Sequence, residues 1–261
     1  MIKWLSNSVN DRSSMEKDIA ELNEDALPAG WQWVNCSVFA RVAHSQGSNN
    51  VFYKQFLPRN YMETPKAWFR GSRCERAIKQ LNVLKDNNFQ SPEVLCWGSL
   101  SGGREFMVTQ AVDGVGVGSY LASYFRGVST PALLKEKREI ISSLGAEVGR
   151  LHQAGIVHGD LRPNNVLIER DGCSIAFHFI DNERNKQYRK IPKKLLIKNL
   201  VQIGMLADID LTNTDRVRFL KAYQRQMSSF NQALVAPIYQ KTRARLVGKD
   251  PDSLGSPNLS K

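Results

Sequence analysis

The sequence lacks the features that mark disulfide-linked, metal-bound or membrane-spanning proteins. Its four cysteines form no C-x-x-C pair, and no two histidines stand at metal-ligand spacing. No stretch reaches the roughly 20 apolar residues that cross a bilayer, and the first residues contain no signal-peptide core. We therefore expect a cytoplasmic protein with reduced, buried thiols that is still able to lie on a membrane face. The cysteines are Cys36, Cys74, Cys96 and Cys173.

Acidic residues are also in short supply. The chain has 25 Asp and Glu against 36 Lys and Arg, which gives a net charge of +11 and a pI of about 9.6. This excess says more about partners than about fold, and it suits nucleic acid, an acidic membrane surface or a phosphorylated glycolipid. The 261 residues are 42% hydrophobic, enough for the core of one large domain or of two smaller lobes.

A complete glycine-rich phosphate loop is missing, but residues 158–165, His-Gly-Asp-Leu-Arg-Pro-Asn-Asn, suit phosphoryl transfer. Asp160 can accept the proton of an attacking hydroxyl, and Asn165 can give its amide oxygen to a Mg²⁺ on nucleotide phosphates. The octet resembles the H-R-D-L-x-x-x-N catalytic loop of the protein-kinase superfamily, with Gly159 in place of the arginine. The alternative interpretation is a polar turn that caps a strand.

A second carboxylate, Asp181, ends the strand predicted over residues 175–181. In a kinase, an Asp at this place holds the Mg²⁺ that bridges the β- and γ-phosphates, so Asp181 joins Asn165 as a predicted metal ligand. The alternative is an Asp that starts a turn. Asn182 and Glu183 replace the usual Phe-Gly, and no A-P-E signal follows. We therefore expect no long activation segment, which argues against a protein substrate.

The first predicted strands cover residues 38–43 and 51–57 and are joined by a polar turn over residues 45–50. In a kinase such a hairpin covers the nucleotide phosphates with backbone N–H groups, and Gly47 is the single glycine of this turn. Lys54 lies among aromatic strand residues, where a buried ammonium requires partners. In kinases this Lys holds the α- and β-phosphates and pairs with a helix Glu. The alternative is a solvent-facing Lys on an edge strand.

A helix is predicted over residues 65–87, because apolar residues recur there at intervals of four and three. Pro65 suits its first turn. Glu75 stands beside the apolar stripe, and we select it as the partner of Lys54. Glu63 and Glu93, in predicted loops, are the competing carboxylates.

Two further strands, residues 94–98 and 105–110, lead into the alternating glycines of residues 111–118. These glycines do not match G-x-G-x-x-G, and we interpret the segment as a flexible connector between lobes. In a kinase the backbone around Gln110 to Val112 would face adenine.

A basic run follows Asp181, where an acceptor would dock. Its usual meaning is a solvated helix face, but this position favours an anionic acceptor or membrane. The run comprises Arg184, Lys186, Arg189, Lys190, Lys193, Lys194 and Lys198.

Three segments, residues 52–56, 151–161 and 179–184, resemble the lipopolysaccharide kinase (Kdo/WaaP) family, as do Asn199-Leu200 and residues 218–223. The resemblance implies ATP-dependent phosphorylation of an inner-core sugar, Kdo or heptose, at the cytoplasmic face of the inner membrane. It implies that Arg162 steadies the γ-phosphoryl charge beside the base Asp160. It also implies ATP and Mg²⁺ as cofactors, an anionic glycolipid as acceptor, peripheral membrane contact and no nucleic-acid partner.

The expected fold class is α+β, a two-lobed protein-kinase-like fold with a small antiparallel sheet lobe and a larger helical lobe. The expected divisions are an extension over 1–30, the sheet lobe over 31–110, the helical lobe over 111–230 and a C-terminal tail over 231–261. The enzyme would be a phosphotransferase with an alcohol group as acceptor. The alternatives are another small-molecule or protein kinase on the same scaffold, and a nucleotide-binding pseudokinase at the membrane surface.

Overall fold

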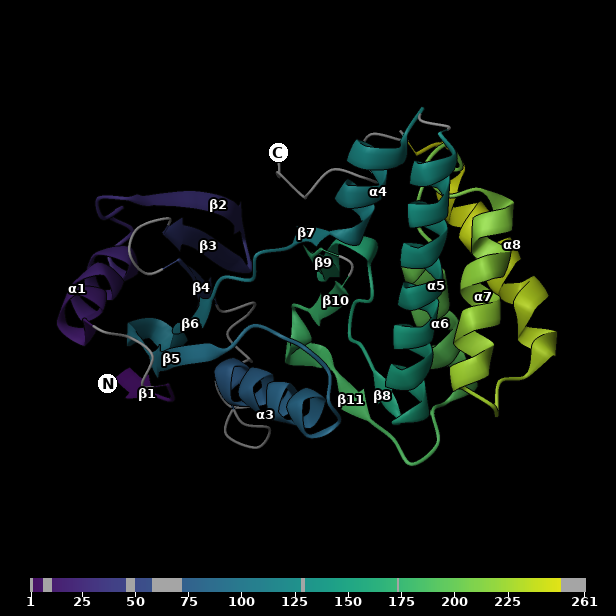
Figure 1. Ribbon diagram of the computed structural model, residues 1–261. Helices are drawn as coiled ribbons and strands as arrows, with labels where there is room; N and C mark the ends of the chain where they lie inside the picture. Colours follow the sequence, from purple (N-terminus) through teal and green to yellow (C-terminus); the bar gives the residue numbers. More distant parts are fainter. Residues whose placement is uncertain are drawn as a thin grey trace. The chain divides into compact units, whose positions relative to one another are not determined.

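The structure is a computed structural model that describes residues 2–6, 11–45, 50–57, 72–127, 130–172 and 174–249. These residues form two compact units (Figure 1). The first, here called the sheet unit, holds the residues up to Lys79 together with Pro92–Val112. The second, the helical unit, holds Gln80–Ser91 and the described residues from Asp113 to Lys249.

A six-stranded antiparallel sheet, in the order β1-β5-β6-β4-β3-β2, forms the frame of the sheet unit. Helix α1, the part of α3 up to Lys79 and the short 3-10 turn η1 complete it. The bounds are β1 (Ile2–Trp4), α1 (Arg12–Asn23), β2 (Trp31–Ser37), β3 (Ala40–Ser45), β4 (Val51–Phe56), α3 (Arg73–Asp86), β5 (Val94–Ser99), η1 (Ser101–Gly103) and β6 (Glu105–Gln110).

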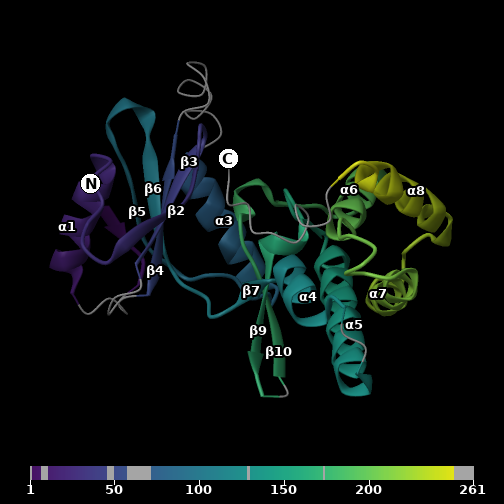
Figure 2. The ribbon, with the colours of Figure 1, turned by 90° about the horizontal axis from the view of Figure 1, so that it is seen from above.

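Each face of this sheet packs against one helix (Figure 2). Strand side chains alternate between the faces, so that Val51 and Tyr53 share the cluster of α1. Phe56 points to the other face, where it packs with Cys74 and Ala77 of α3. Lys54 alternates with Tyr53 and therefore lies on the α3 face.

Residues 2–6 and 11–23, within the segment predicted as an N-terminal extension, lie in the sheet unit. Strand β1 pairs with β5, and Ile2 lies opposite Gly98. Helix α1 buries one apolar face, formed by Met15, Ile19 and Leu22. The sequence did not indicate β1, because a strand of three residues carries almost no periodic signal.

The helical unit consists of five helices in its described part, together with short strands and turns. Two small antiparallel sheets lie beside the helices, in the orders β10-β9-β7 and β11-β8. The bounds are β7 (Val115–Gly116), α4 (Val117–Phe125), α5 (Pro131–Gln153), β8 (Ile156–Val157), η2 (Pro163–Asn165), β9 (Val166–Asp171), β10 (Ser174–Phe179), η3 (Asn182–Arg184), β11 (Lys186–Gln187), α6 (Lys193–Ile203), α7 (Asn213–Gln226), η4 (Gln232–Leu234) and α8 (Val235–Leu246).

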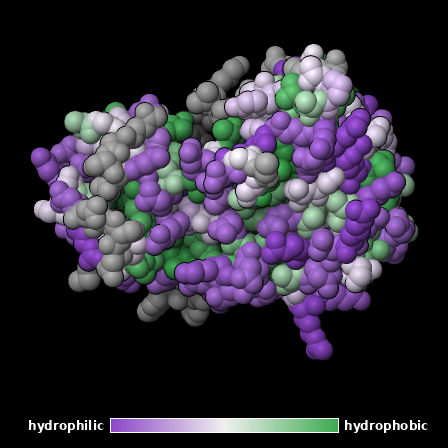
Figure 3. Space-filling model, in the orientation of Figure 1, coloured by the Kyte–Doolittle hydropathy of each residue, from purple (hydrophilic) through white to green (hydrophobic). Residues whose placement is uncertain are grey.

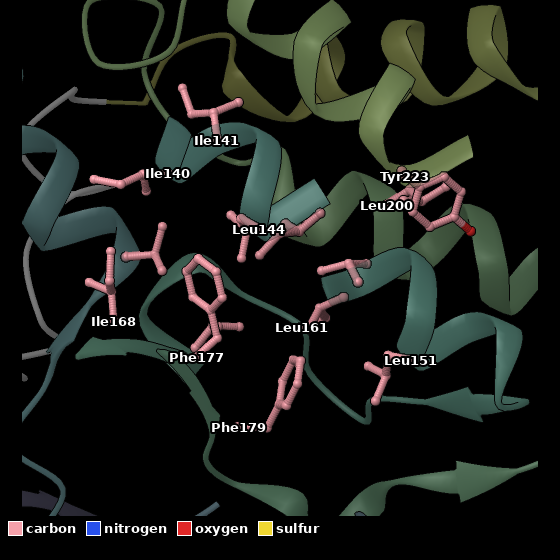
Figure 4. Packing of buried hydrophobic residues seen from close by; sticks show 14 of the residues in the cluster. Ile140, Ile141, Leu144, Leu151, Leu161, Ile168, Phe177, Phe179, Leu200 and Tyr223 are labelled. Carbon is pink, nitrogen blue, oxygen red and sulfur yellow. The ribbon is translucent and has the colours of Figure 1, made fainter. Parts of the chain in front are cut away.

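One apolar core joins the helices of this unit to its small sheets (Figure 4). Ile140 and Leu144 of α5 point toward Phe177 of β10, and Leu200 contributes from α6. Leu161, from the segment between β8 and η2, is completely buried in this core. The buried side chain of Leu161 thus anchors the loop that carries Asp160 to the core.

The predicted C-terminal tail contains a packed helix. Val235 and Ile238 of α8 pack against the core, and Thr242 is buried. The sequence prediction missed this helix because its exposed face is polar and basic and masks a narrow apolar stripe. Residues 250–261, the end of that predicted tail, lie outside the described part of the chain.

Candidate active site

The loop of residues 158–165 is held rigid by a completely buried histidine. His158 Nε2–H donates to the carbonyl of Ile180 at 3.0 Å, and Nδ1 accepts the N–H of Asp160 at 3.1 Å. Burial lowers the pKa of His158 from its ordinary value, so the ring stays neutral and keeps one donor and one acceptor. His158 therefore positions the loop through these two hydrogen bonds.

Asn165 and Asp181 lie on adjacent chain segments. The N–H of Ile180, one residue before Asp181, donates to the carbonyl of Asn165 at 3.0 Å. The side-chain NH₂ of Asn165 donates to the carbonyl of Asp160 at 2.8 Å. Because an amide carries its donor and acceptor on opposite sides, this bond turns the amide oxygen of Asn165 away from the loop.

Asp181 has a left-handed backbone, with φ of 62° and ψ of 41°. Among the described residues, Asp25 and Asn88 are the other non-glycine residues with positive φ, and both directly follow helices. At a helix exit this conformation is common. Asp181 instead adopts it between β10 and η3, where a strained backbone orients an exposed carboxylate.

The carboxylate of Asp160 is held at one oxygen. Gln202 of α6 donates to Oδ1 at 2.5 Å, and Arg162 Nε lies 3.2 Å from the same atom. The side chain of Asp160 is 32% exposed and that of Arg162 is 59% exposed. Sequence analysis missed Gln202, although Asn199 and Gln202 interrupt an apolar helix stripe three residues apart and could have indicated an inward polar function.

A buried polar network beneath the loop centres on Asn199. Its amide oxygen accepts the N–H of His158 at 3.0 Å, and its NH₂ donates to the carbonyl of the same residue at 2.8 Å. His152 lies 3.2 Å from that amide oxygen and 2.9 Å from the hydroxyl of Tyr223. Burial lowers the pKa of His152 to about 4, so this ring is neutral too. The network joins α5, α6 and α7 to the backbone of the loop.

Gly159 stands where the kinase pattern has arginine, because another segment crosses at that point. A Cβ at Gly159 would lie 2.3 Å from Cβ of Arg184 and 3.0 Å from its Cα. The N–H of Gly159 donates to Asn185, and Lys198 Nζ donates to its carbonyl at 2.9 Å. The glycine is therefore required for the segment after Asp181 to pack on the loop.

The alternating glycines of residues 111–118 do not form the flexible connector that the sequence suggested. Gly116 ends β7, Gly118 lies in the first turn of α4, and both pack on Asn164. A Cβ at Gly116 or Gly118 would lie 2.7 or 2.6 Å from the amide oxygen of Asn164, which accepts the N–H of Ser119 at 3.0 Å. These glycines are small so that two backbones can approach closely.

In the sheet unit, Lys54 is half-buried on β4, opposite Val42 of β3 and Met107 of β6. Its ammonium lies 5.3 Å from the ring centroid of Phe56, on the face that α3 covers. Lys54 is on a central strand, so the edge-strand alternative is wrong.

Glu75 caps the helix on which it lies. Ser72 Oγ accepts the N–H of Glu75, and the carboxylate of Glu75 accepts the N–H of Ser72, both at 3.0 Å. This reciprocal capping box stabilises the first turn of α3, and the Glu75 side chain is exposed. The pairing of Glu75 with Lys54 stays a prediction. Glu63, Pro65 and the predicted first turns of this helix lie outside the described residues.

Two turns flank Lys54 at opposite ends of the sheet. The predicted phosphate turn with Gly47 lies outside the described residues, but its neighbour Asn50 accepts the N–H of Ala111 beside Gln110. The chain also turns at Val38-Phe39, inside the strand predicted over residues 38–43. There Ser37 Oγ accepts the N–H groups of Phe39 and Ala40. This turn connects β2 and β3, and it lies at the end of the sheet away from Gln110.

The N–H of Gln110 donates to Glu93, and Ala111 donates to Asn50. Within the described residues, Val112 is the first position of this connector for which no backbone hydrogen bond is observed. The role predicted for the backbone from Gln110 to Val112 stays a prediction.

The segment after Asp181 is short. Residues 182–192 alone separate it from α6, and β11 within this segment pairs with β8 just before the loop. All seven residues of the basic run are exposed. Arg184 and Lys198 both contact Gly159, so both ends of the run reach the residue next to Asp160. Hydrophilic side chains also cover most of the visible face of the helical unit (Figure 3).

Two searches of the described residues were negative. None of their helices is both long and apolar enough to span a bilayer. They also contain no cluster of three or more His, Cys, Asp or Glu that could hold a metal. The pairing of Asn165 and Asp181 as oxygen ligands stays a prediction; Mg²⁺ is commonly held by one or two such protein groups when phosphates complete its shell.

Solved structures share this fold. WaaP in complex with acyl carrier protein superposes with a TM-score of 0.62 at 18% identity, covering 92% of this chain and 98% of that one. An aminoglycoside-3'-phosphotransferase of type VIII gives a TM-score of 0.50 at 16% identity, covering 89% and 99%. The protein-kinase-like α+β fold class expected from the sequence is thereby confirmed.

Sequence comparison adds a local and a broad match. The local one is to the KEOPS complex subunit Bud32 of Pyrococcus abyssi (strain GE5 / Orsay), 40% identical over 48 residues, which are 18% of this chain and 20% of that protein. The broad one spans residues 57–223 and includes the whole catalytic-type loop and Asp181. On this match the chain belongs to the Lipopolysaccharide kinase (Kdo/WaaP) family.

Proposed function

We propose that this protein is an ATP-dependent kinase that transfers the γ-phosphoryl group to a hydroxyl of a lipopolysaccharide inner-core sugar, Kdo or heptose. Family membership supports a phosphotransferase related to lipopolysaccharide. The observation that carries the proposal is the arrangement of Asp160, Asn165 and Asp181 around one rigid loop. Phosphoryl transfer to a hydroxyl uses a carboxylate that accepts the proton, together with oxygen ligands that hold the metal ion.

Asn165 and Asp181 would hold Mg²⁺. Their fit rests on the bond from Asn165 to Asp160, which leaves the amide oxygen for a cation, and on the backbone of Asp181, which presents an exposed carboxylate. When bound, Mg²⁺ and ATP supply the phosphoryl group and neutralise the charge that develops on it.

The sheet unit would bind the nucleotide. Lys54 would hold the α- and β-phosphates with Glu75 as its partner, and the backbone from Gln110 to Val112 would face adenine. We revise one assignment. Adenine at Gln110 would place the Gly47 turn at the adenine end of the sheet, so the turn at Val38-Phe39 is the better cover for the phosphates.

Asp160 would accept the proton of the sugar hydroxyl as it attacks, and Arg162 would steady the γ-phosphoryl charge. Arg162 already lies 3.2 Å from Asp160 and is exposed enough to turn toward a phosphate. Proton transfer contributes about 10²–10⁴-fold to such reactions. Positioning and charge neutralisation by the remaining residues would supply the rest.

The acceptor would be an anionic glycolipid at the cytoplasmic face of the inner membrane. The exposed basic run would face that surface, and its two ends contact Gly159, next to the proposed base. Basic residues near an anionic membrane each add about 1 kcal/mol of attraction. The short segment after Asp181 favours such an acceptor over a protein.

Replacing the proposed base tests the function. Asp160→Asn should lower phosphate transfer from ³²P-labelled ATP to isolated core glycolipid by at least about 100-fold, because the hydroxyl loses its proton acceptor. The thermal shift caused by ATP and Mg²⁺ should remain in this variant, whereas Asp181→Ala should lose its Mg²⁺-dependent part.

Controls separate the alternative functions. Casein-like proteins should remain unlabelled; labelling of casein in preference to glycolipid would favour a protein kinase. Wild-type protein that binds ATP but labels no acceptor would favour a pseudokinase. Unchanged transfer by Asp160→Asn would refute the assignment of the base.

A further inference from the structure

The two carboxylate oxygens of Asp160 lie in different environments. Both described contacts, from Gln202 and from Arg162, are made to Oδ1. No hydrogen bond or ion pair to Oδ2 is observed within the described part of the chain. An oxygen that already accepts a short hydrogen bond and lies beside a guanidinium is a poorer proton acceptor than one without these contacts.

Gln202 is the more rigid of the two donors. It is 7% exposed and lies in the middle of α6, whereas the Arg162 side chain is 59% exposed. A buried side chain on a helix holds its geometry more closely than an exposed one on a loop.

The orientation of the Gln202 amide is set by Asn199. The Asn199 oxygen accepts the backbone N–H of His158, so its nitrogen is the donor, and this nitrogen lies 3.3 Å from Oε1 of Gln202. The Gln202 oxygen is thereby occupied, and its NH₂ faces Asp160. A relay of two amides thus runs from the backbone of the loop to the carboxylate.

We propose that Gln202 is the positioning residue for Asp160, and that it fixes Oδ2 as the oxygen that takes the proton of the acceptor hydroxyl. The proposal rests on the phosphotransferase function proposed above. It goes further by naming the reacting oxygen and the residue that selects it. Gln202 acts through Asp160 and would not touch the acceptor.

The test replaces the amide while keeping its volume. Gln202→Met removes the donor, and Gln202→Glu adds a carboxylate that would repel Oδ1. We expect kcat to fall by about 10- to 100-fold for Met, because a small misplacement of a catalytic group has an effect of that size. The fall should be larger for Glu. The KM for ATP should stay within about twofold, because chemistry and not binding is affected.

Gln224→Met is the matched control, because Gln224 lies on α7 and its described bond is to Gln232, away from the loop. Its kcat should be unchanged. If Gln202→Met retained more than half of the wild-type kcat, the proposal would be overturned. A loss of kcat that tracked a fall in melting temperature, with the KM for ATP rising in parallel, would show a merely structural role and would overturn it too.

A crystal structure of Gln202→Met separates this proposal from the proposed function. The carboxylate of Asp160 should rotate or become disordered when its donor is lost, whatever the acceptor is. An unchanged carboxylate would overturn the positioning role even if glycolipid phosphorylation were confirmed. A rotated carboxylate, in a protein that labels no glycolipid, would support positioning and refute the function.

Discussion

At the scale of single residues, Gly159 shows how one departure from the kinase pattern is compensated. The arginine position is closed to any side chain, because the backbone of Arg184 lies directly beside it. Asn185 and Lys198 instead bond to the N–H and the carbonyl of Gly159. The loop thus keeps its shape through contacts with its backbone.

Gly159→Ala tests this packing. The added Cβ would require the segment 184–185 to shift, and we expect a loss of about 1 to 3 kcal/mol in the free energy of unfolding, as for overpacked sites. Urea denaturation would measure it. Gly204→Ala is the control, since its Cβ would come no closer than 3.2 Å to any neighbour. Equal losses in both variants would contradict the close approach at Gly159.

Among the secondary-structure elements, α5 and α7 lie side by side (Figure 1) and share a buried charge cluster. Lys137 of α5 lies 3.2 Å from Asp215 of α7, and both side chains are 8% exposed. Asp215 also pairs with Arg218 at 2.8 Å and closes the capping box of α7 with Thr212. The carboxylate of Asp215 therefore caps the start of α7 and also pairs this helix with α5.

Lys137→Met should destabilise the protein by about 1 to 3 kcal/mol. This expected loss of stability is at or below the usual cost of breaking a buried ion pair, because Arg218 still neutralises Asp215. Thermal unfolding would measure the change. Lys135→Met, on the exposed side of the same helix, should stay within about 0.5 kcal/mol. A similar effect of both substitutions would show that the Lys137 pair contributes no more than a surface pair.

The β2–β3 turn is an element that sequence reasoning missed. Val38 and Phe39 look like strand residues, since they are apolar and favour β structure. Both are exposed, and the hydroxyl of Ser37 supplies the hydrogen bonds that a glycine or asparagine turn would otherwise need. The polar stretch of residues 45–50 carried the stronger turn signal and received the phosphate-cover prediction, which the described residues do not test.

For the whole molecule, the two buried histidines predict a dependence of stability on pH. Burial lowers the pKa of His152 from 6.5 to about 4 and lowers that of His158 as well. The unfolded chain takes up protons below about pH 6.5 that the folded chain refuses, so stability is full above this pH and is lost as the pH falls toward 4. From its shift, His152 alone would account for at most about 3 kcal/mol.

Urea denaturation at several pH values between 7.5 and 4.5 would measure this loss. His152→Gln should flatten the dependence while it lowers stability at pH 7.5, because glutamine takes up no proton. His44→Gln, at a partly exposed site on β3, should leave the slope unchanged. A slope in His152→Gln equal to that of the wild type would refute the assignment of the effect to this ring.

The sequence by itself determined the fold class, the family and the candidate chemical groups. Asp160, Asn165 and Asp181 could be found in this way because their spacing is imposed by local chain geometry around one loop. Lys54 was found because an ammonium among aromatic strand residues conflicts with the pattern around it.

Only the tertiary structure decided what holds these groups in place. Gln202, Asn199 and Asn185 lie between 26 and 42 residues away from the loop residues that they bond, and no local pattern in the sequence predicts such pairings. The same holds for Gly116 and Gly118, whose packing on Asn164 looks like flexibility in the sequence. Local periodicity reports which face of an element is buried, but the partner on that face depends on how distant segments pack together.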